Sequence, residues 1–152
     1  MMLNLRNETR DITQSLKLFV VLTRSLDAVQ KRVKENIQEL GLNPTEFAVL
    51  ELIYNKGEQP IQKISQKILI ASSSTTYVVD NLEAKGLIKR KPCPNDRRIT
   101  YAVMTEAGYE LMDDLFPKHQ LAIQEIFSGL TTEEKDLMID QLKKLGYHAE
   151  NM

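Results

Sequence analysis

The sequence predicts a mainly α-helical fold that carries one small β-hairpin. Apolar residues recur at intervals of three and four near both ends of the chain, which is the spacing of amphipathic helices. Helix-capping signals and isolated glycines divide this pattern into separate elements. Residues 87–104 depart from this helical spacing. They form two short candidate strands on either side of a polar tip, as in a β-hairpin. At 152 residues, the chain suits one domain.

The first expected helix spans residues 12–40 and ends at Gly41, because glycine commonly terminates helices. A second helix, residues 47–56, follows a start signal in which Asn43 is the cap and Glu46 holds the capping-box position. This second helix is apolar on nearly every side, so we expect it at the centre of the fold. The stripe of the first helix consists of Ile12, Leu16, Phe19, Leu22, Leu26, Val29, Val33, Ile37 and Leu40.

A helix-turn-helix followed by a hairpin is expected next. Pro60 begins a short helix, and a second helix starts at Ala71 with a run of serines and threonines and stops at Gly86. Strands at residues 87–92 and 99–104 then enclose a polar tip. This is the layout of a winged helix-turn-helix, in which the second helix enters the major groove of DNA and the hairpin reaches an adjacent groove. The inward residues of the short helix are Ile61, Ile64, Ile68 and Leu69.

Two further helices close the chain. One is expected over residues 105–126, and a capping box at residues 131–134 begins a last helix that ends near Gly146. Pro117 lies inside the first of these and should kink it, because proline has no N–H to donate. The terminal helices have more apolar surface than one small winged domain can cover. That surface could pack within the chain, but we favour a dimerisation bundle, since helix-turn-helix proteins usually pair to read two half-sites.

Charge is distributed unevenly along a chain whose net charge is −1. Residues 56–98 carry nine basic and four acidic side chains, whereas residues 99–152 carry four and ten. Positive charge therefore concentrates on the segment expected to bind a DNA groove, as contact with phosphates requires. A solvated basic face explains the charge equally well, and the coincidence with the helix-turn-helix pattern favours DNA.

Composition narrows the class of protein and its location. Hydrophobic residues at 42% and charged residues at 27% are typical of a soluble globular chain. No apolar run approaches the ~18–20 residues of a membrane span, and the N-terminus has no signal-peptide pattern. The single cysteine cannot form an internal disulfide. We therefore expect a cytoplasmic protein with no membrane partner and no cofactor.

Candidate DNA contacts lie at the start of the second helix and at the hairpin tip. Short hydroxyls can approach base edges closely, and a helix N-terminus offers free N–H groups to phosphate. Arg97 and Arg98 at the tip are the stronger candidates, and Asp96 is expected to orient an arginine through a paired hydrogen bond. An ordinary helix start and an exposed turn would look the same in sequence. The helix candidates are Ser72, Ser73, Ser74, Thr76 and Tyr77.

The chain resembles the MarR family of winged helix-turn-helix regulators, in residues 82–90, in Asp96-Arg97-Arg98 and in residues 104–108. The resemblance implies a homodimer that binds pseudopalindromic promoter DNA, usually as a repressor released by a small ligand or by oxidation. It also implies a division of the single domain into a winged part, residues 43–105, and a helical dimerisation region, residues 1–42 and 106–152.

Of the candidate DNA contacts, Arg98 agrees with the family pattern and Tyr77 departs from it. Arg98 matches the family arginine that enters the minor groove, where narrow A·T-rich DNA concentrates negative potential. Tyr77 stands where the family often has a basic residue, which leaves the operator sequence open. The stretch from Asn43 through Pro94 further resembles members that respond to quinones or hydroquinones.

In the family fold, effectors bind where the first, second and fifth helices meet. Phe19, Phe47, Glu51 and His119 could therefore line a pocket for an aromatic ligand with hydroxyl groups, such as a phenol or quinone. Glu51 is the sole charge in its apolar helix, so it should either find a partner or have a raised pKa. A Glu51–His119 pair, or separate partners for the two groups in a packed core, is the alternative.

Cys93 is a second candidate sensor. It lies among several basic residues of the hairpin, and nearby cations increase the reactivity of a thiol. The family's peroxide-sensing cysteine lies near the start of the first helix, however, where this chain has none. An incidental thiol in the hairpin is therefore the favoured interpretation, and a thiol-based redox repressor is the alternative.

The sequence does not favour an enzyme. Two histidines and one cysteine give no zinc-type ligand spacing, and the chain lacks a Gly-rich phosphate loop and a nucleophile elbow. We therefore expect neither a catalytic site nor a metal site. A winged-helix module that binds protein instead of DNA is the remaining alternative, because fold does not fix function.

Overall fold

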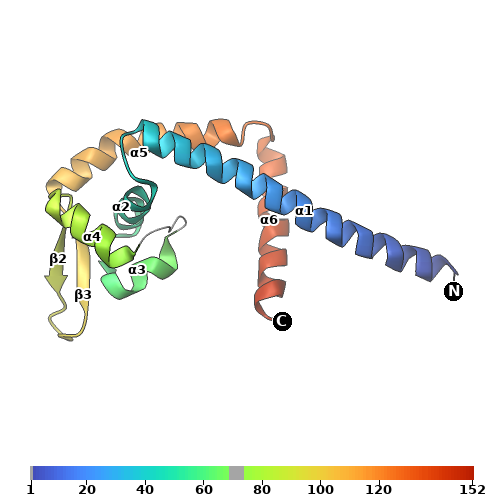
Figure 1. The fold of residues 1–152 in the computed structure, drawn as a ribbon, viewed down its shortest axis with the longest axis horizontal. Coiled ribbons are helices and arrows are strands. Elements are labelled where there is room, and N and C mark those ends of the chain that lie inside the picture. The colour runs from blue at the N-terminus through green and yellow to red at the C-terminus, as the bar shows by residue number, and fades with distance from the viewer. Residues whose placement is uncertain (1, 69–73) are drawn as a thin grey trace.

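The computed structural model describes residues 2–68 and 74–152 as a small winged body from which two helices extend (Figure 1). The elements agree with the expected mainly α-helical fold. In chain order they are α1 (Met2–Glu39), α2 (Pro44–Lys56), β1 (Gln59–Pro60), α3 (Ile61–Lys67), α4 (Thr75–Ala84), β2 (Ile88–Pro92), β3 (Thr100–Met104), α5 (Glu106–Ile126) and α6 (Thr132–Glu150).

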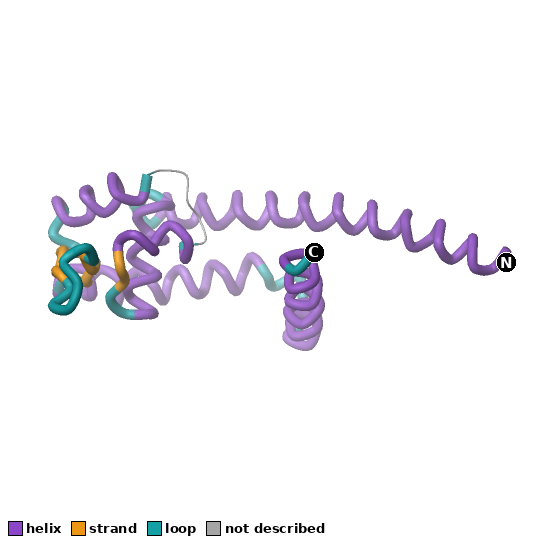
Figure 2. Tube along the Cα trace, turned by 90° about the horizontal axis from the view of Figure 1, so that it is seen from below, coloured by secondary structure: helices purple, strands orange, loops and turns teal. Residues whose placement is uncertain are grey.

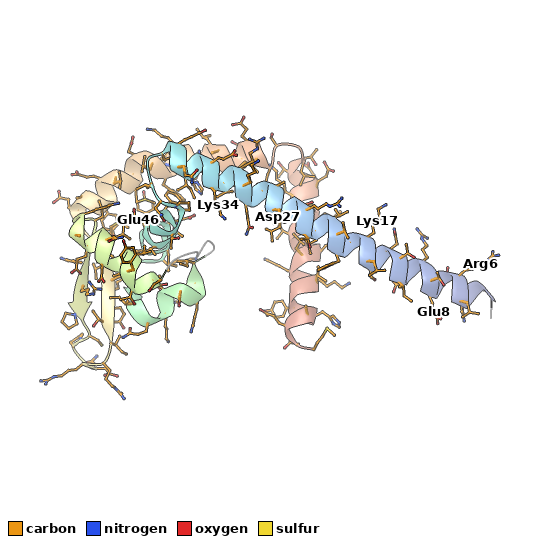
Figure 3. The ribbon with its side chains drawn as sticks, in the orientation of Figure 1. Arg6, Glu8, Lys17, Asp27, Lys34 and Glu46 are labelled. Atoms are coloured by element: carbon orange, nitrogen blue, oxygen red, sulfur yellow. The ribbon has the colours of Figure 1, made fainter. Side chains whose placement is uncertain are left out.

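The helix α2 forms the centre of the winged body, as its apolar sequence predicted. The Asn43 side chain caps it by accepting hydrogen bonds from the backbone N–H groups of Thr45 and Glu46, at 2.8 and 3.3 Å. Glu46 pairs with Lys85, with Oε2 and Nζ 2.8 Å apart, so it joins α2 to the end of α4 (Figure 3). The core around α2 includes Phe47, Val49, Leu50, Ile53, Ile64, Val79, Leu82, Ile88, Ala102 and Met112.

The hairpin of β2 and β3 is part of a three-stranded antiparallel sheet in the order β1-β3-β2. The expected hairpin is confirmed, but β1 was missed. Its two residues are too few to show alternation, and Pro60 was expected to begin a helix. Instead Pro60 pairs with Tyr101 in the sheet, and the following helix α3 begins at Ile61.

The helix α1 begins at Met2, ten residues earlier than expected, and only its C-terminal part packs on the body. There Ile37 is buried and Val33 packs against the core. Figure 2 shows α1 beside α5 and then continuing far beyond it. Arg6 and Lys17 are exposed on this free half (Figure 3). Large apolar side chains are exposed there too: Leu5, Ile12, Leu16, Leu18, Phe19, Val20 and Val21.

The caps of the last two helices are confirmed. Thr105 Oγ1 accepts from the Gly108 N–H at 3.1 Å, and Thr131 and Glu134 form a reciprocal capping box. The helix α5 is continuous through Pro117, and the expected kink stays a prediction. Within residues 2–68 and 74–152, no helix has the length and apolar character to cross a membrane.

Candidate functional site

One face of α4 is buried and the other is exposed. Val78, Val79 and Leu82 pack into the core, as the sequence predicted. Thr76 and Tyr77 are exposed, the latter to 64%, and Ser74 is exposed just before the helix. A row of hydroxyl groups therefore faces solvent along the start of α4. Ser72, Ser73 and Leu69, and the expected helix start at Ala71, lie outside the described residues.

The tip of the hairpin holds two arginines away from the body. Arg97 and Arg98 are both exposed, and the Arg98 side chain is 91% exposed. Both carboxylate oxygens of Asp96 accept hydrogen bonds from this side chain. Oδ1 lies 3.1 Å from Nε of Arg98, and Oδ2 lies 3.1 Å from Nη2. These hydrogen bonds lower the pKa of Asp96. The expected pairing is thus confirmed, and its two contacts fix the direction of the guanidinium.

The tip is also tied to the helix-turn-helix. Gln62 of α3 donates from Nε2 to the backbone oxygen of Arg98 at 3.0 Å. Within the tip, the Cys93 N–H donates to the Ile99 oxygen at 3.0 Å. The hairpin and α3 therefore carry Arg98 at a defined position relative to α4. Cys93 itself is a free, half-buried thiol in this turn.

Much of the positive charge in the middle of the chain is neutralised locally, which a count of residues could not reveal. Arg90 pairs with both Asp80 and Glu83 of α4. Lys91 lies near Glu58, with Nζ and Oε2 3.7 Å apart. The cations of residues 56–68 and 74–98 without a carboxylate partner in the described structure include Lys63, Lys89 and Arg97.

A cavity of about 410 Å³ lies where α1, α2 and α5 meet, and it contains three of the four predicted ligand-binding residues. Phe47 and Glu51 come from α2, and His119 comes from α5. The buried His119 ring lies 4.6 Å from the Phe47 ring, and its Nδ1 is 3.2 Å from Asn36 Oδ1. Among the described residues, the lining consists of Leu26, Gln30, Val33, Ile37, Phe47, Ala48, Glu51, His119 and Ile123.

Burial acts on the two titratable groups of this cavity in opposite directions. It raises the pKa of Glu51 and lowers the pKa of His119, because both charged forms lose hydration. Among the described contacts, His119 bonds to Asn36 and not to Glu51. The alternative of a Glu51–His119 pair is therefore wrong. The Glu51 carboxyl remains available to a hydroxyl group in the cavity.

Phe19 does not reach this cavity, contrary to the prediction. Its side chain is 69% exposed on the free half of α1. It precedes Leu26 by seven residues, which is about 10 Å along a straight helix. The wall of the cavity is supplied instead by Leu26, Gln30 and Val33. The apolar stripe alone could not show at which turn α1 leaves the body.

The two extended helices expose apolar faces. The structure describes α6 completely and shows no buried residue in it. An apolar cleft of about 470 Å³ separates α5 from α6 and is lined by Phe127, Met138, Ile139 and Leu142 among others. The exposed apolar residues of α6 are Leu137, Met138, Ile139, Leu142, Leu145 and Tyr147.

Comparison with known proteins agrees with this architecture. Residues 42–100 match the MarR family. The chain is 51% identical over 136 residues to the HTH-type transcriptional regulator MhqR of Bacillus subtilis, covering 90% of this chain and 94% of that protein.

Two solved structures share the fold at lower identity. One is a MarR family regulator from Streptomyces coelicolor in complex with DNA, with a TM-score of 0.76, 18% identity, and coverage of 90% of this chain and 91% of that one. The other is BpsR of Bordetella bronchiseptica, whose DNA binding is regulated by 6-hydroxynicotinic acid, with a TM-score of 0.72, 22% identity, and coverage of 85% and 92%. The chain therefore belongs to the MarR family and is a DNA-binding transcriptional regulator, not an enzyme.

Proposed function

We propose that the protein is a homodimeric repressor that binds a pseudopalindromic promoter site and is released by a small phenolic or quinone-like ligand. The observation that carries this proposal is the cavity between α1, α2 and α5, with a half-buried Glu51 and a buried His119 in its wall. It lies where α1 leaves the winged body and packs against α2 and α5. A ligand bound there can change the position of the winged body relative to α1.

In this proposal the exposed start of α4 reads the major groove and the hairpin tip enters the minor groove. Ser74, Thr76 and Tyr77, together with Ser72 and Ser73, supply the contacts of the helix. Arg98 supplies the minor-groove contact, with Arg97 beside it. Arginine suits this position because a narrow A·T-rich minor groove concentrates negative potential.

Dimerisation is supported by the apolar faces of α1 and α6. Residues 1–42 and 106–152 form the dimerisation region, and residues 43–105 form the winged part. A second copy would cover side chains that one chain leaves exposed and would place two α4 helices on successive turns of DNA. A repressor that binds promoter DNA in this way acts in the cytoplasm.

The chemistry of the cavity favours an aromatic ligand with hydroxyl groups. Phe47 and the apolar residues can contact a ring, and the Glu51 carboxyl can accept a hydrogen bond from a hydroxyl. BpsR, a structural neighbour, is regulated by a hydroxylated aromatic acid. Such a ligand releases DNA only if it binds the DNA-incompetent conformation more tightly than the competent one.

A mobility-shift assay on the promoter region upstream of the protein's own gene, with and without a catechol or hydroquinone, tests this function. We expect wild-type protein to bind and the ligand to release it. His119→Ala should respond less to the ligand while binding DNA as well as wild type without it. Phe47→Leu is the second variant of the cavity wall. It is preferred to Phe47→Ala, which would lower stability by about 3–5 kcal/mol.

Cys93→Ser separates the ligand from the alternative of a thiol sensor. Release of this variant by the same ligand at the same concentration supports the cavity. If Cys93→Ser alone abolishes release, Cys93 is the sensor and the cavity has no regulatory role. A wild-type protein that binds no DNA but captures a protein would favour the interaction-module alternative.

A further inference from the structure

The hairpin directs Arg90 toward α4, and its side chain remains 33% exposed. Side chains alternate between the two faces of a strand, and Ile88, two residues earlier in β2, is 1% exposed in the core. Arg90 pairs in register with Ala102 of β3, which is fully buried. Arg90 therefore shares the inward face of the sheet, whereas its neighbours Lys89 and Lys91 belong to the outer face.

Two carboxylates of α4 meet this arginine. Asp80 and Glu83 are three residues apart, so they lie on the same face of the helix. Nη2 of Arg90 contacts Asp80 Oδ1, and Nη1 lies 3.1 Å from Glu83 Oε2. The hydrogen bond to Asp80 is the main reason that the pKa of Arg90 is raised. Both ends of the guanidinium are thus occupied by α4.

Uncompensated carboxylates at these positions would oppose DNA binding. Asp80 and Glu83 remain 57% and 41% exposed on the helix that is proposed to enter the groove. A negative charge near phosphates is repelled, and the repulsion is weakly screened when the groups are close. Arginine is suited to cancel both charges, because its planar fork can bond two acceptors at once, whereas lysine offers a single charged point.

We propose that Arg90 is a positioning residue for DNA binding: it neutralises Asp80 and Glu83, so that the exposed face of α4 meets DNA without unpaired negative charge. The proposal rests on the proposed contacts of α4 and the tip with DNA. In it, Arg90 acts through α4 and makes no contact with phosphate. The exposed Lys89, one residue earlier on the outer face, has no carboxylate partner among the described residues and is the matched cation.

The test is a charge-compensation cycle on a duplex from the protein's own upstream promoter region that wild type binds. Affinity and its salt dependence are measured for wild type, Arg90→Gln, Asp80→Asn/Glu83→Gln, and the triple variant. A random duplex of equal length is measured in parallel. We expect Arg90→Gln to weaken binding roughly tenfold or more, because it leaves two charges unpaired. The triple variant should recover most of that loss.

The same cycle with Lys89→Gln supplies the control. Lys89→Gln removes one cation without releasing a carboxylate, so Asp80→Asn/Glu83→Gln should change its affinity by no more than it changes that of wild type. Thermal unfolding of each variant checks that the fold is kept. Arg90→Lys keeps the charge but loses the fork, so it should fall between wild type and Arg90→Gln.

The outcomes separate clearly. Recovery in the triple variant, with little effect of Asp80→Asn/Glu83→Gln on wild type, supports neutralisation of the two carboxylates by Arg90. If the two neutral substitutions improve wild type and Arg90→Gln by the same factor, Arg90 acts independently of them and the proposal is overturned. Unchanged affinity of Arg90→Gln overturns it as well. If wild type binds no promoter fragment, the proposed function has failed, and that failure is distinct from failure of the role proposed for Arg90.

Discussion

The helices α2 and α6 differ sharply in how many of their residues the same chain buries. The 13 residues of α2 include seven that are buried. The 19 residues of α6, all of them described, include none. Figure 1 shows α2 enclosed by the winged body, whereas α6 stands apart from it. Burial of apolar surface is the main stabilising contribution to folding. The winged body therefore buries its apolar residues within one chain, whereas α6 leaves its apolar face uncovered.

The first test of this comparison lies in the core. Leu50 of α2 is fully buried, so Leu50→Ala should lower the free energy of unfolding by about 2–5 kcal/mol. Urea denaturation measures the change. Leu137→Ala in α6 is the matched substitution, because Leu137 is 61% exposed. In protein dilute enough to be monomeric, an equal loss from Leu137→Ala would contradict the difference between the two helices.

The second test concerns assembly through α6. Leu142 lines the apolar cleft between α5 and α6 and is 43% exposed. Leu142→Asp should weaken dimerisation by about 2–4 kcal/mol, the cost of losing a central apolar contact. Light scattering at micromolar concentration should then report the monomer mass of 17.4 kDa. Lys143→Asp on the same helix should stay dimeric, and a monomeric wild type would remove the basis for the whole comparison.

The third test contrasts two exposed arginines, one on each region. Arg98→Ala at the hairpin tip should weaken binding to promoter DNA by about 1–3 kcal/mol and leave thermal stability nearly unchanged, since the side chain is exposed. Arg6→Ala on the free half of α1 should leave DNA affinity as it is. Titration at physiological salt measures both. Equal effects of the two variants would mean that only total charge matters.

The smallest expected effect is a change in the pH dependence of stability caused by His119, which lies in the cavity between α1, α2 and α5. Burial lowers the pKa of His119 below its ordinary value of 6.5. The unfolded chain therefore takes up a proton at higher pH than the folded chain, so stability should fall as pH drops below about 6.5. His119→Gln should show less of this fall in thermal unfolding between about pH 7.5 and about pH 5.5.

Glu51 should act in the opposite sense. Burial raises its pKa above the ordinary 4.5, so the folded chain retains a proton that the unfolded chain has lost. Stability should decline as pH rises above about 4.5, and Glu51→Gln should reduce that decline. An identical pH profile for wild type and both variants would show that neither group is buried enough to matter.

Most of the helices and the hairpin could be predicted, because their signals are local. Asn43, Thr105 and Thr131 cap helices within four residues of themselves. The exposed hydroxyls of α4 followed from the placement of its apolar residues. Other features had no local signal. The start of α1 at Met2 was missed because the apolar stripe begins only at Ile12, and β1 was too short to alternate.

The candidate site divides in the same way. The Asp96–Arg98 pair was predictable, because the two residues share one turn. The pairing of Arg90 with Asp80 and Glu83 could have been suspected from the position of Ile88 in the strand. No sequence pattern placed Asn36 beside His119, since those residues are 83 positions apart.

The sequence by itself determined the order of the helices, their caps, the hairpin and the basic middle segment. Each of these depends on residues a few positions apart, where backbone geometry brings side chains together whatever the rest of the chain does. Only the tertiary structure decided that Phe19 lies away from Phe47 and His119, which cations are neutralised, and which apolar faces stay uncovered. Those outcomes depend on the angle at which helices cross and the turn at which α1 leaves the body, and packing sets both.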